Sequence, residues 1–170
     1  MQAYIALLRA VNVGGTGKLP MTELKAMCEA AGFKSVQTYI ASGNVVFKSA
    51  KTEAQVKAAL DAALAAYVGK PVGVLVRTAA EMAAVLAGNP FPEKPANLTV
   101  AIFLDKPPAT DVLKDVTGKI SEEFRPGQRE IYVYYPDGQG QSKLKIPAAK
   151  SGTARNMNTV AKLAEMASGL

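Results

Sequence analysis

The first half of the chain alternates short apolar runs, typical of strands, with stretches in which apolar residues recur at helical spacing. Residues 3–8 are rich in Ile, Leu and Tyr and predict a strand. A helix is expected to follow, with Pro20 in its first turn. Gly32 is expected to end it. One face of this helix carries Met21, Leu24, Cys28 and Ala31.

Two more strands and a second helix follow. β-like runs at 36–40 and 45–48 flank Ser42-Gly43-Asn44 and predict a hairpin. A capping box at 52–55 opens a long helix, which Gly69 ends. Its buried side is expected to carry Val56, Leu60, Leu64 and Tyr67.

A strand at 71–77 completes the order β-α-β-β-α-β for residues 2–77, which is the ferredoxin-like unit. The second half is a looser copy of this pattern. In chain order we expect a helix at 81–86, a strand at 98–104, a short helix at 110–116, a strand at 130–135 and a helix at 154–167.

The predicted fold class is therefore α+β, with two ferredoxin-like halves packed into one compact body. We place the first half at 1–78 and the second, with the C-terminal helix, at 79–170. The strands at 3–8 and 72–76 are apolar on both faces, whereas a lone ferredoxin-like unit leaves one sheet face to water. The second half is expected to cover that face.

Composition excludes several kinds of chemistry. The 170 residues include no His, so there is no Ser-His-Asp triad, no Cys-His pair and no ordinary His-ligated zinc. The single cysteine, Cys28, excludes an internal disulfide and is expected to be a small core residue. We expect neither a metal nor a cofactor. Every apolar run is too short to span a membrane, and we expect a cytoplasmic protein with no membrane partner.

The net charge of +6 is unevenly spread along the chain. Residues 1–77 carry nine basic and four acidic side chains, and residues 138–170 carry five and one. The middle, 78–137, is acidic, with six basic and nine acidic side chains. The basic ends indicate either a surface that attracts phosphates or a solvated basic surface without a dedicated ligand.

Three segments combine Gly, polar and basic residues in ways that core packing does not require. The first, 8–18, fails the Walker pattern, because Asn12 stands at the first Gly position and Leu19 replaces the metal-binding hydroxyl. What remains is a strand, a Gly-rich turn and a helix start, whose backbone N–H groups can hold an anion or simply shape a turn. In the second, 38–47, Ser42 and Asn44 are expected mainly to shape the hairpin.

The third segment, 142–160, places Arg155, Asn156 and Asn158 near a predicted helix N-terminus. An arginine at that end of a helix is unfavourable by about 0.3–1 kcal/mol, and a bound anion would offset this. An Asn there is also a common N-cap, so the segment has a purely structural interpretation as well.

These motifs resemble an uncharacterised bacterial family, number 1697 among the domains of unknown function. The resemblance rests on Leu-Arg-x-x-Asn-Val-Gly-Gly, Thr-Tyr-x-x-Ser-Gly-Asn-Val-Val-Phe and Thr-x-Arg-Asn-x-Asn-Thr-Val, in that order, and runs over residues 2–167. Ala10 stands where many members have Gly, and Met157 where many have an aromatic ring. The resemblance implies an α+β fold with ferredoxin-like halves and no particular reaction.

Our leading hypothesis is a non-enzymatic protein that binds a phosphate-bearing ligand or nucleic acid. Arginines would contact the phosphate, and asparagines would orient the ligand. Lysines, Lys145 among them, would supply a positive electrostatic field. The alternatives are an enzyme acting on a small phosphorylated or nucleotide substrate, and a structural or dimerisation module. The hypothesised anion site comprises Arg9, Asn12, Gly14, Gly15, Lys18, Ser42, Asn44, Lys143, Arg155, Asn156 and Asn158.

Other candidate groups have simpler interpretations. Asp111 and Asp115, four residues apart, are expected to be surface charges on the predicted helix at 110–116. Tyr132 and Tyr134 project to one side of their strand, where they can stack on bases or, more commonly, pack a partly buried sheet face.

Overall fold

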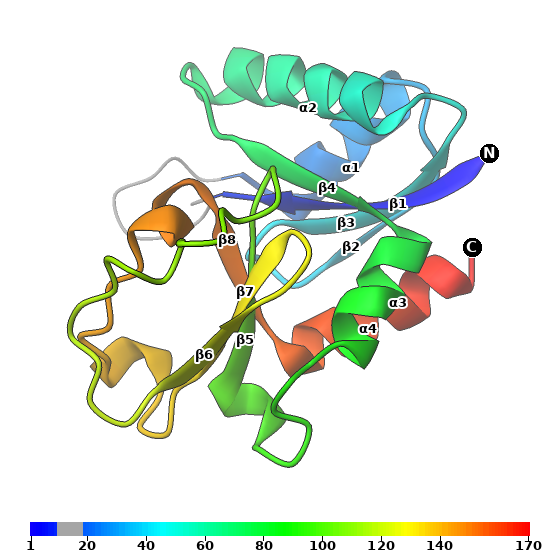
Figure 1. The fold of residues 1–170 in the computed structure, drawn as a ribbon. Coiled ribbons are helices and arrows are strands. Elements are labelled where there is room, and N and C mark those ends of the chain that lie inside the picture. Colours follow the sequence, from blue (N-terminus) through cyan, green and yellow to red (C-terminus); the bar gives the residue numbers. More distant parts are fainter. Residues whose placement is uncertain (10–18) are drawn as a thin grey trace. The chain divides into compact units, whose positions relative to one another are not determined.

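A computed structural model describes residues 1–9 and 19–170 (Figure 1). By their contacts the residues form two units, one comprising 1–82 and 163–170 and the other 83–162. The division falls inside two helices, α3 (Ala79–Ala87) and α4 (Met157–Ser168). The expected boundary at 78/79 between two folding domains stays a prediction.

The first unit contains a four-stranded antiparallel sheet with the strand order β2-β3-β1-β4. Two helices make the crossovers, α1 between β1 and β2 and α2 between β3 and β4, so the expected β-α-β-β-α-β order and the hairpin are confirmed. The elements are β1 (Gln2–Leu8), α1 (Met21–Ala30), β2 (Lys34–Tyr39), β3 (Asn44–Ser49), α2 (Glu53–Val68) and β4 (Val74–Thr78).

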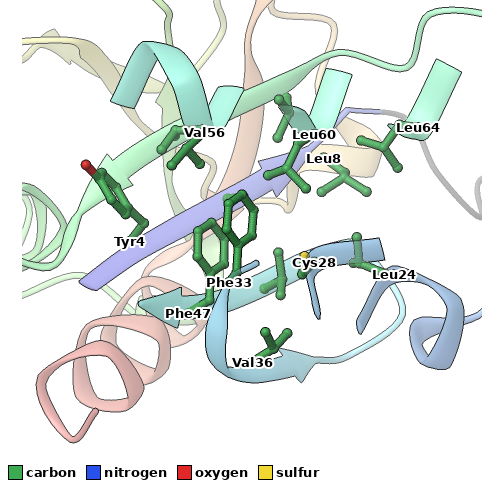
Figure 2. Packing of buried hydrophobic residues seen from close by; sticks show 14 of the residues in the cluster. Tyr4, Leu8, Leu24, Cys28, Phe33, Val36, Phe47, Val56, Leu60 and Leu64 are labelled. Atoms are coloured by element: carbon green, nitrogen blue, oxygen red, sulfur yellow. The ribbon is translucent and has the colours of Figure 1, made fainter. Parts of the chain in front are cut away.

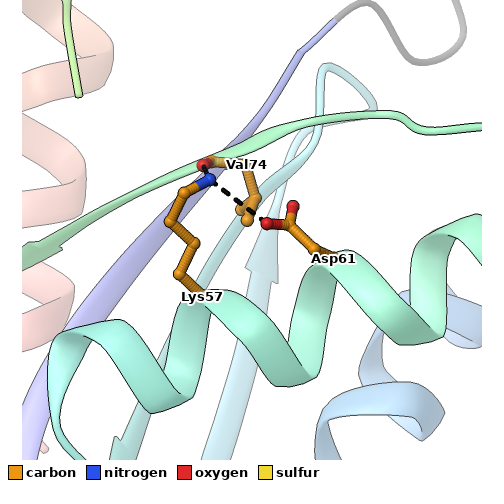
Figure 3. Close-up of polar contacts among 3 residues, drawn as sticks. All are labelled: Lys57, Asp61 and Val74. Atoms are coloured by element: carbon orange, nitrogen blue, oxygen red, sulfur yellow. Dashed lines mark hydrogen bonds and ion pairs between the residues drawn. The ribbon is translucent and has the colours of Figure 1, made fainter.

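The ends of α2 follow from its sequence. Thr52 and Gln55 form the predicted capping box, in which the Thr52 hydroxyl accepts from the Gln55 N–H and the Gln55 side chain accepts from the Thr52 N–H. Gly69 ends the helix at φ 86°, a left-handed conformation that favours glycine. Lys57 ties α2 to the start of β4, because its Nζ donates to the Val74 carbonyl at 2.8 Å and to the Asp61 carboxylate at 3.2 Å (Figure 3).

Helices α1 and α2 supply the core on one face of the first sheet (Figure 2). Leu24 and Cys28 of α1 are buried, as the helical spacing predicted. The predicted buried face of α2 is confirmed at Val56, Leu60 and Leu64 but is wrong at Tyr67, which is 47% exposed. Spacing fixes the face of a helix, whereas the point at which packing stops along its length depends on the partner.

The second unit contains another four-stranded antiparallel sheet, with the strand order β6-β7-β5-β8. Taken in chain order within each half, this is the strand order of the first sheet. The fold is therefore α+β with two ferredoxin-like halves, as expected. The strands are β5 (Thr99–Phe103), β6 (Glu123–Pro126), β7 (Glu130–Tyr134) and β8 (Thr153–Asn156).

The crossovers of the second half differ from those of the first. The helix predicted at 110–116 is wrong, because 110–115 form turns with bonds such as Val112 N–H to Ala109 C=O. The backbone bonds here span three residues, as from Lys114 N–H to Asp111 C=O, and close separate turns rather than an α-helix. The second crossover contains two 3-10 helices, η2 (Gln139–Gln141) and η3 (Pro147–Ser151).

The predicted helix at 154–167 begins later than expected. Residues 154–156 belong to β8, which pairs with β5 so that Arg155 lies opposite Ala101, and α4 starts at Met157. Backbone pairing with β5 thus replaces helical bonding in this stretch. No helix in the described part of the chain is both long enough and apolar enough to cross a membrane.

A second core lies on one face of the second sheet. Val100, Ile102, Ile131 and Val133 are buried there, and the residues packed on them come from the irregular segments 112–116 and 144–149. On the other face, the Tyr132 hydroxyl donates to the Val85 carbonyl of α3 at 2.8 Å. Turns and 3-10 helices therefore cover a face that helices cover in the first unit.

Candidate ligand-binding site

The turn between β2 and β3 is built by its own polar side chains. Asn44 is fully buried, and its Nδ2 donates to the Tyr39 carbonyl and to the Ser42 hydroxyl, each at 3.0 Å. The Leu8 N–H donates to the Gly43 carbonyl at 2.9 Å, which joins the turn to the end of β1. Ser42 and Asn44 thus shape the hairpin, as their default interpretation predicted.

Arg9 lies at the same end of the first sheet. Its N–H donates to the Gly73 carbonyl at 3.1 Å, next to the start of β4. A Cβ on Gly73 would stand 3.1 Å from Arg9 Cδ, so the arginine stem runs along the glycine backbone. Arg9, Ser42 and Asn44 therefore gather at one end of the first sheet. The other members of the predicted site in this half, Asn12, Gly14, Gly15 and Lys18, lie outside the described residues.

In the second unit, Arg155 lies in a strand rather than at the predicted helix N-terminus. It is buried, and its Nη1 donates to the Thr153 hydroxyl at 2.8 Å and to the Ala154 carbonyl at 2.9 Å. Desolvation by burial lowers the pKa of its guanidinium to about 10. The expected dipole cost does not arise, because the residue precedes the helix and belongs to the sheet.

The two asparagines of this motif have different environments. The Asn156 Oδ1 accepts from the Thr159 N–H at 3.0 Å and caps α4, which is the structural role considered for it. Asn158, in the first turn of α4, is exposed, as is Lys143 in the segment between η2 and η3. That the motif residues of both units form one site stays a prediction.

The second unit contains a cavity of about 770 Å³ that the motif analysis did not indicate. It lies on the sheet face that the irregular crossovers cover. The apolar part of its wall is formed by Ile102, Leu144, Ile146, Pro147, Ala149 and Ala154. The polar side chains around it are those of Asp115, Thr117, Tyr135, Gln139, Lys145, Lys150 and Thr153.

The two crossover segments are joined where they border the cavity. Thr117 and Lys145 form an antiparallel bridge, with N–H to C=O bonds of 3.0 and 2.8 Å in the two directions. Gly118 follows at φ 75°, and a Cβ there would overlap the carbonyl of Lys143. This close approach and this φ both require glycine.

A buried carboxylate adds a second link between the same segments. The Glu122 side chain accepts from the Ser142 hydroxyl at 2.5 Å and from the Ile120 N–H at 2.7 Å, and the Ser142 oxygen accepts in turn from the Leu144 N–H. The bond from Ser142, followed by those from the backbone, lowers the pKa of Glu122 from 4.5 to about 2. Glu122 thus holds the segment that carries the cavity lysine Lys145.

The cavity combines cations with apolar surface. Lys145 and Lys150 are exposed at its wall, whereas Ile146 and Tyr135 are buried. Burial, with a smaller contribution from the Glu122 carboxylate, raises the pKa of Tyr135, so its phenol remains a neutral hydroxyl. A concave, largely apolar wall with a few polar groups is the usual form of a small-molecule site. The charged side chains at this wall are two lysines and one aspartate.

Several other candidate groups have structural roles. Burial raises the pKa of the Cys28 thiol to about 12, so it is a core residue and no nucleophile. Tyr132 is buried and its hydroxyl is hydrogen-bonded to the Val85 carbonyl of α3, and the Tyr134 ring lies against Phe91. These tyrosines therefore pack the sheet face, the commoner of their two interpretations. Among the described residues, no three His, Cys, Asp or Glu side chains are grouped so that they could hold a metal ion.

The sequence held a partial signal for the cavity. Lys145 and Lys150 belong to the basic segment 138–170, and Lys145 was expected to attract phosphate. Asp115 was interpreted as a helical surface charge because a helix was expected there. No local pattern marked Thr117 or Gln139, since they meet the lysines only through the irregular crossovers.

Comparison with known proteins gives one family and one fold. A family model described as a protein of unknown function (DUF1697) matches residues 1–132, so the motif at 142–160 lies beyond the match. Among solved structures, the conserved bacterial protein SP0830 from Streptococcus pneumoniae is similar over 97% of this chain and 98% of that chain, with a TM-score of 0.80 and 24% identity. That similarity shows a shared fold. No curated protein matches the chain.

Proposed function

The chain belongs to the DUF1697 family of proteins of unknown function, and we propose that it is a non-enzymatic protein that binds a small phosphate-bearing ligand in the cavity of its second unit. The observation that carries the proposal is that one cavity of about 770 Å³ is lined both by two lysines, Lys145 and Lys150, and by apolar side chains. That volume lies within the range of about 300–1,000 Å³ typical of drug-sized ligands.

The charges favour an anion. A lysine ammonium is a compact point charge with three N–H donors, well suited to phosphate oxygens. The chain segment that supplies most of the cavity wall adds to this field, because residues 138–154 carry three basic side chains and no acidic one. The field attracts anions before contact and strengthens their binding at low salt.

The apolar wall favours a small molecule over a nucleic-acid polymer. Ile102, Ile146 and Ala154 offer aliphatic surface, which suits the apolar faces of a compact organic group. Sequence-independent nucleic-acid sites instead use a basic groove with aromatic stacking platforms. Of the two kinds of phosphate-bearing partner expected from sequence, the cavity therefore supports the small ligand.

Thermal unfolding tests the proposal. The protein is heated with pyrophosphate, AMP or a single-stranded oligonucleotide at fixed ionic strength, since a ligand that binds only the folded state raises the midpoint. We expect AMP to raise the midpoint of the wild type and to have little effect on Lys145→Gln. Lys143→Gln is the matched control, because Lys143 is an exposed lysine two residues away that does not line the cavity.

Two outcomes would contradict the cavity assignment. One is equal loss of the AMP shift in both lysine variants, which would indicate a diffuse basic surface. The other is a shift with the oligonucleotide alone that Arg9→Ala abolishes, which would return the function to nucleic-acid binding at the end of the first sheet.

A further inference from the structure

The cavity holds polar groups that an anion alone does not need. Asp115, Thr117, Gln139 and Thr153 lie on its wall together with the two lysines. An ionised carboxylate accepts hydrogen bonds and donates none, so it repels a bare phosphate. Asp115 therefore disfavours ligands that consist of an anion and nothing else.

The same carboxylate favours a ligand with O–H or N–H donors. We infer that the cavity selects a phosphorylated sugar, free or as part of a nucleoside phosphate, and that Asp115 is the residue that recognises its hydroxyl groups. This inference rests on the proposed function, because the lysines must hold the phosphate. Neighbouring sugar hydroxyls present two donors to one carboxylate, and hydrogen bonds to a charged group are stronger than those between neutral groups.

The chain geometry brings these groups to one wall. Asp115 and Thr117 are two residues apart, and the bridge sets Thr117 directly opposite Lys145. In an antiparallel bridge, opposite side chains project to the same side with Cβ atoms about 4.5–5.5 Å apart. The donor-binding and phosphate-binding groups thus come from two segments that are hydrogen-bonded to each other.

The remaining wall fits a sugar ring as well. Thr117 and Thr153 have hydroxyls that donate and accept, and Gln139 has an amide that does both. Ile146 and Ala154 supply aliphatic surface for the C–H face of a ring. An alkyl phosphate would use the lysines and the aliphatic surface but would leave the Asp115 carboxylate without a donor.

The test compares two phosphate monoesters, one with sugar hydroxyls and one without, by calorimetric titration. Ribose 5-phosphate carries hydroxyls, and butyl phosphate carries none. For the wild type we expect about tenfold tighter binding of ribose 5-phosphate, the value of one hydrogen bond to a charged group. Asp115→Ala should bring this ratio close to one, weakening ribose 5-phosphate and strengthening butyl phosphate.

Asp111→Ala is the matched control, since Asp111 is an exposed acid four residues earlier in the same turn segment and does not line the cavity. It should keep the wild-type ratio, and a ratio lost equally in both variants would overturn the inference. Equal binding of the two phosphates by the wild type, lost in Lys145→Gln, would also overturn it while leaving the proposed function intact. Absence of binding by both phosphates would overturn the inference and the proposed function together.

Discussion

The two halves of this protein share a strand order and differ in what crosses their sheets. In the first half, α1 and α2 make both crossovers and their apolar residues are packed against the sheet. In the second half, turns and short 3-10 helices make the equivalent crossovers, and a cavity is lined partly by them and partly by the sheet. Strand order therefore sets the fold, whereas the crossovers decide what packs on a sheet face and whether a pocket opens beside it.

The physical basis is the regularity of a helix. A helix offers apolar side chains every three or four residues, in rows that interlock with a sheet. Leu60 of α2 is completely buried in this way. The irregular segments of the second half carry exposed polar side chains at the cavity wall, such as Thr117 and Gln139, beside apolar ones that pack on the sheet, such as Leu113. The second sheet face is therefore covered by segments of mixed polarity.

The largest effect is expected when a buried side chain is truncated on the covered face of each sheet. Leu60→Ala should lower the free energy of unfolding by about 3 kcal/mol or more, because it leaves a void among packed side chains. Ile146→Ala should cost about 1 kcal/mol less, because Ile146 borders a cavity and has fewer neighbours to lose. Urea unfolding measures both. Equal losses would show that the second face is packed as tightly as the first.

Glycines offer the next comparison. Gly69 and Gly118 both have positive φ, 86° and 75°, but a Cβ would meet open space at Gly69 and the Lys143 carbonyl at Gly118. Gly69→Ala should cost about 1–2 kcal/mol, the conformational penalty alone. Gly118→Ala should cost about 3 kcal/mol, because the backbone must also shift. The denaturation midpoint measures both. Similar costs would mean that the backbone around Gly118 and Lys143 can shift without a large loss of stability.

The smallest expected effect is a pH dependence confined to the second half. The pKa of Glu122 is about 2 in the folded protein against 4.5 ordinarily, so its bonds stabilise the fold above about pH 4.5 and are lost as the pH falls toward 2. Glu122→Gln should lower the unfolding midpoint at pH 7 and flatten its decline between pH 4.5 and 2. Ser142→Ala, which removes the main donor, should do the same in part. An unchanged slope in both would contradict the assigned role.

The sequence predicted the first half well because local signals mark each element there. The capping box at Thr52 and the glycines at 32 and 69 lie where α1 and α2 begin or end. The second half lacked such marks. Strands β6 and β8 have four residues each. β6 pairs with β7, just beyond it in the chain, whereas β8 pairs with β5, which lies far earlier in the sequence. That pairing is invisible in a short window of sequence.

The candidate site was predicted only in part for a related reason. The polar motifs suggested Asn44, Arg155 and Asn156 as ligand-binding residues. In the structure their side chains make hydrogen bonds within a turn, a strand and a helix N-terminus. Lys145, which the sequence suggested only as a source of positive charge, lies at the cavity wall, whereas Lys143 of the hypothesised site does not. The cavity is lined by residues of two irregular segments that are joined through the bridge between Thr117 and Lys145. Hydrophobic periodicity does not predict such a long-range contact.

The division of the chain gives the second unit the topology of an insertion. Residues 163–170 group with 1–82, so the second unit lies between two pieces of the first along the chain. During synthesis, the first piece therefore leaves the ribosome long before its partner at 163–170 has been made. All strands of both sheets precede that segment. Both sheets can therefore form before the last turns of α4 have been made, and residues 163–170 can join the first unit afterwards.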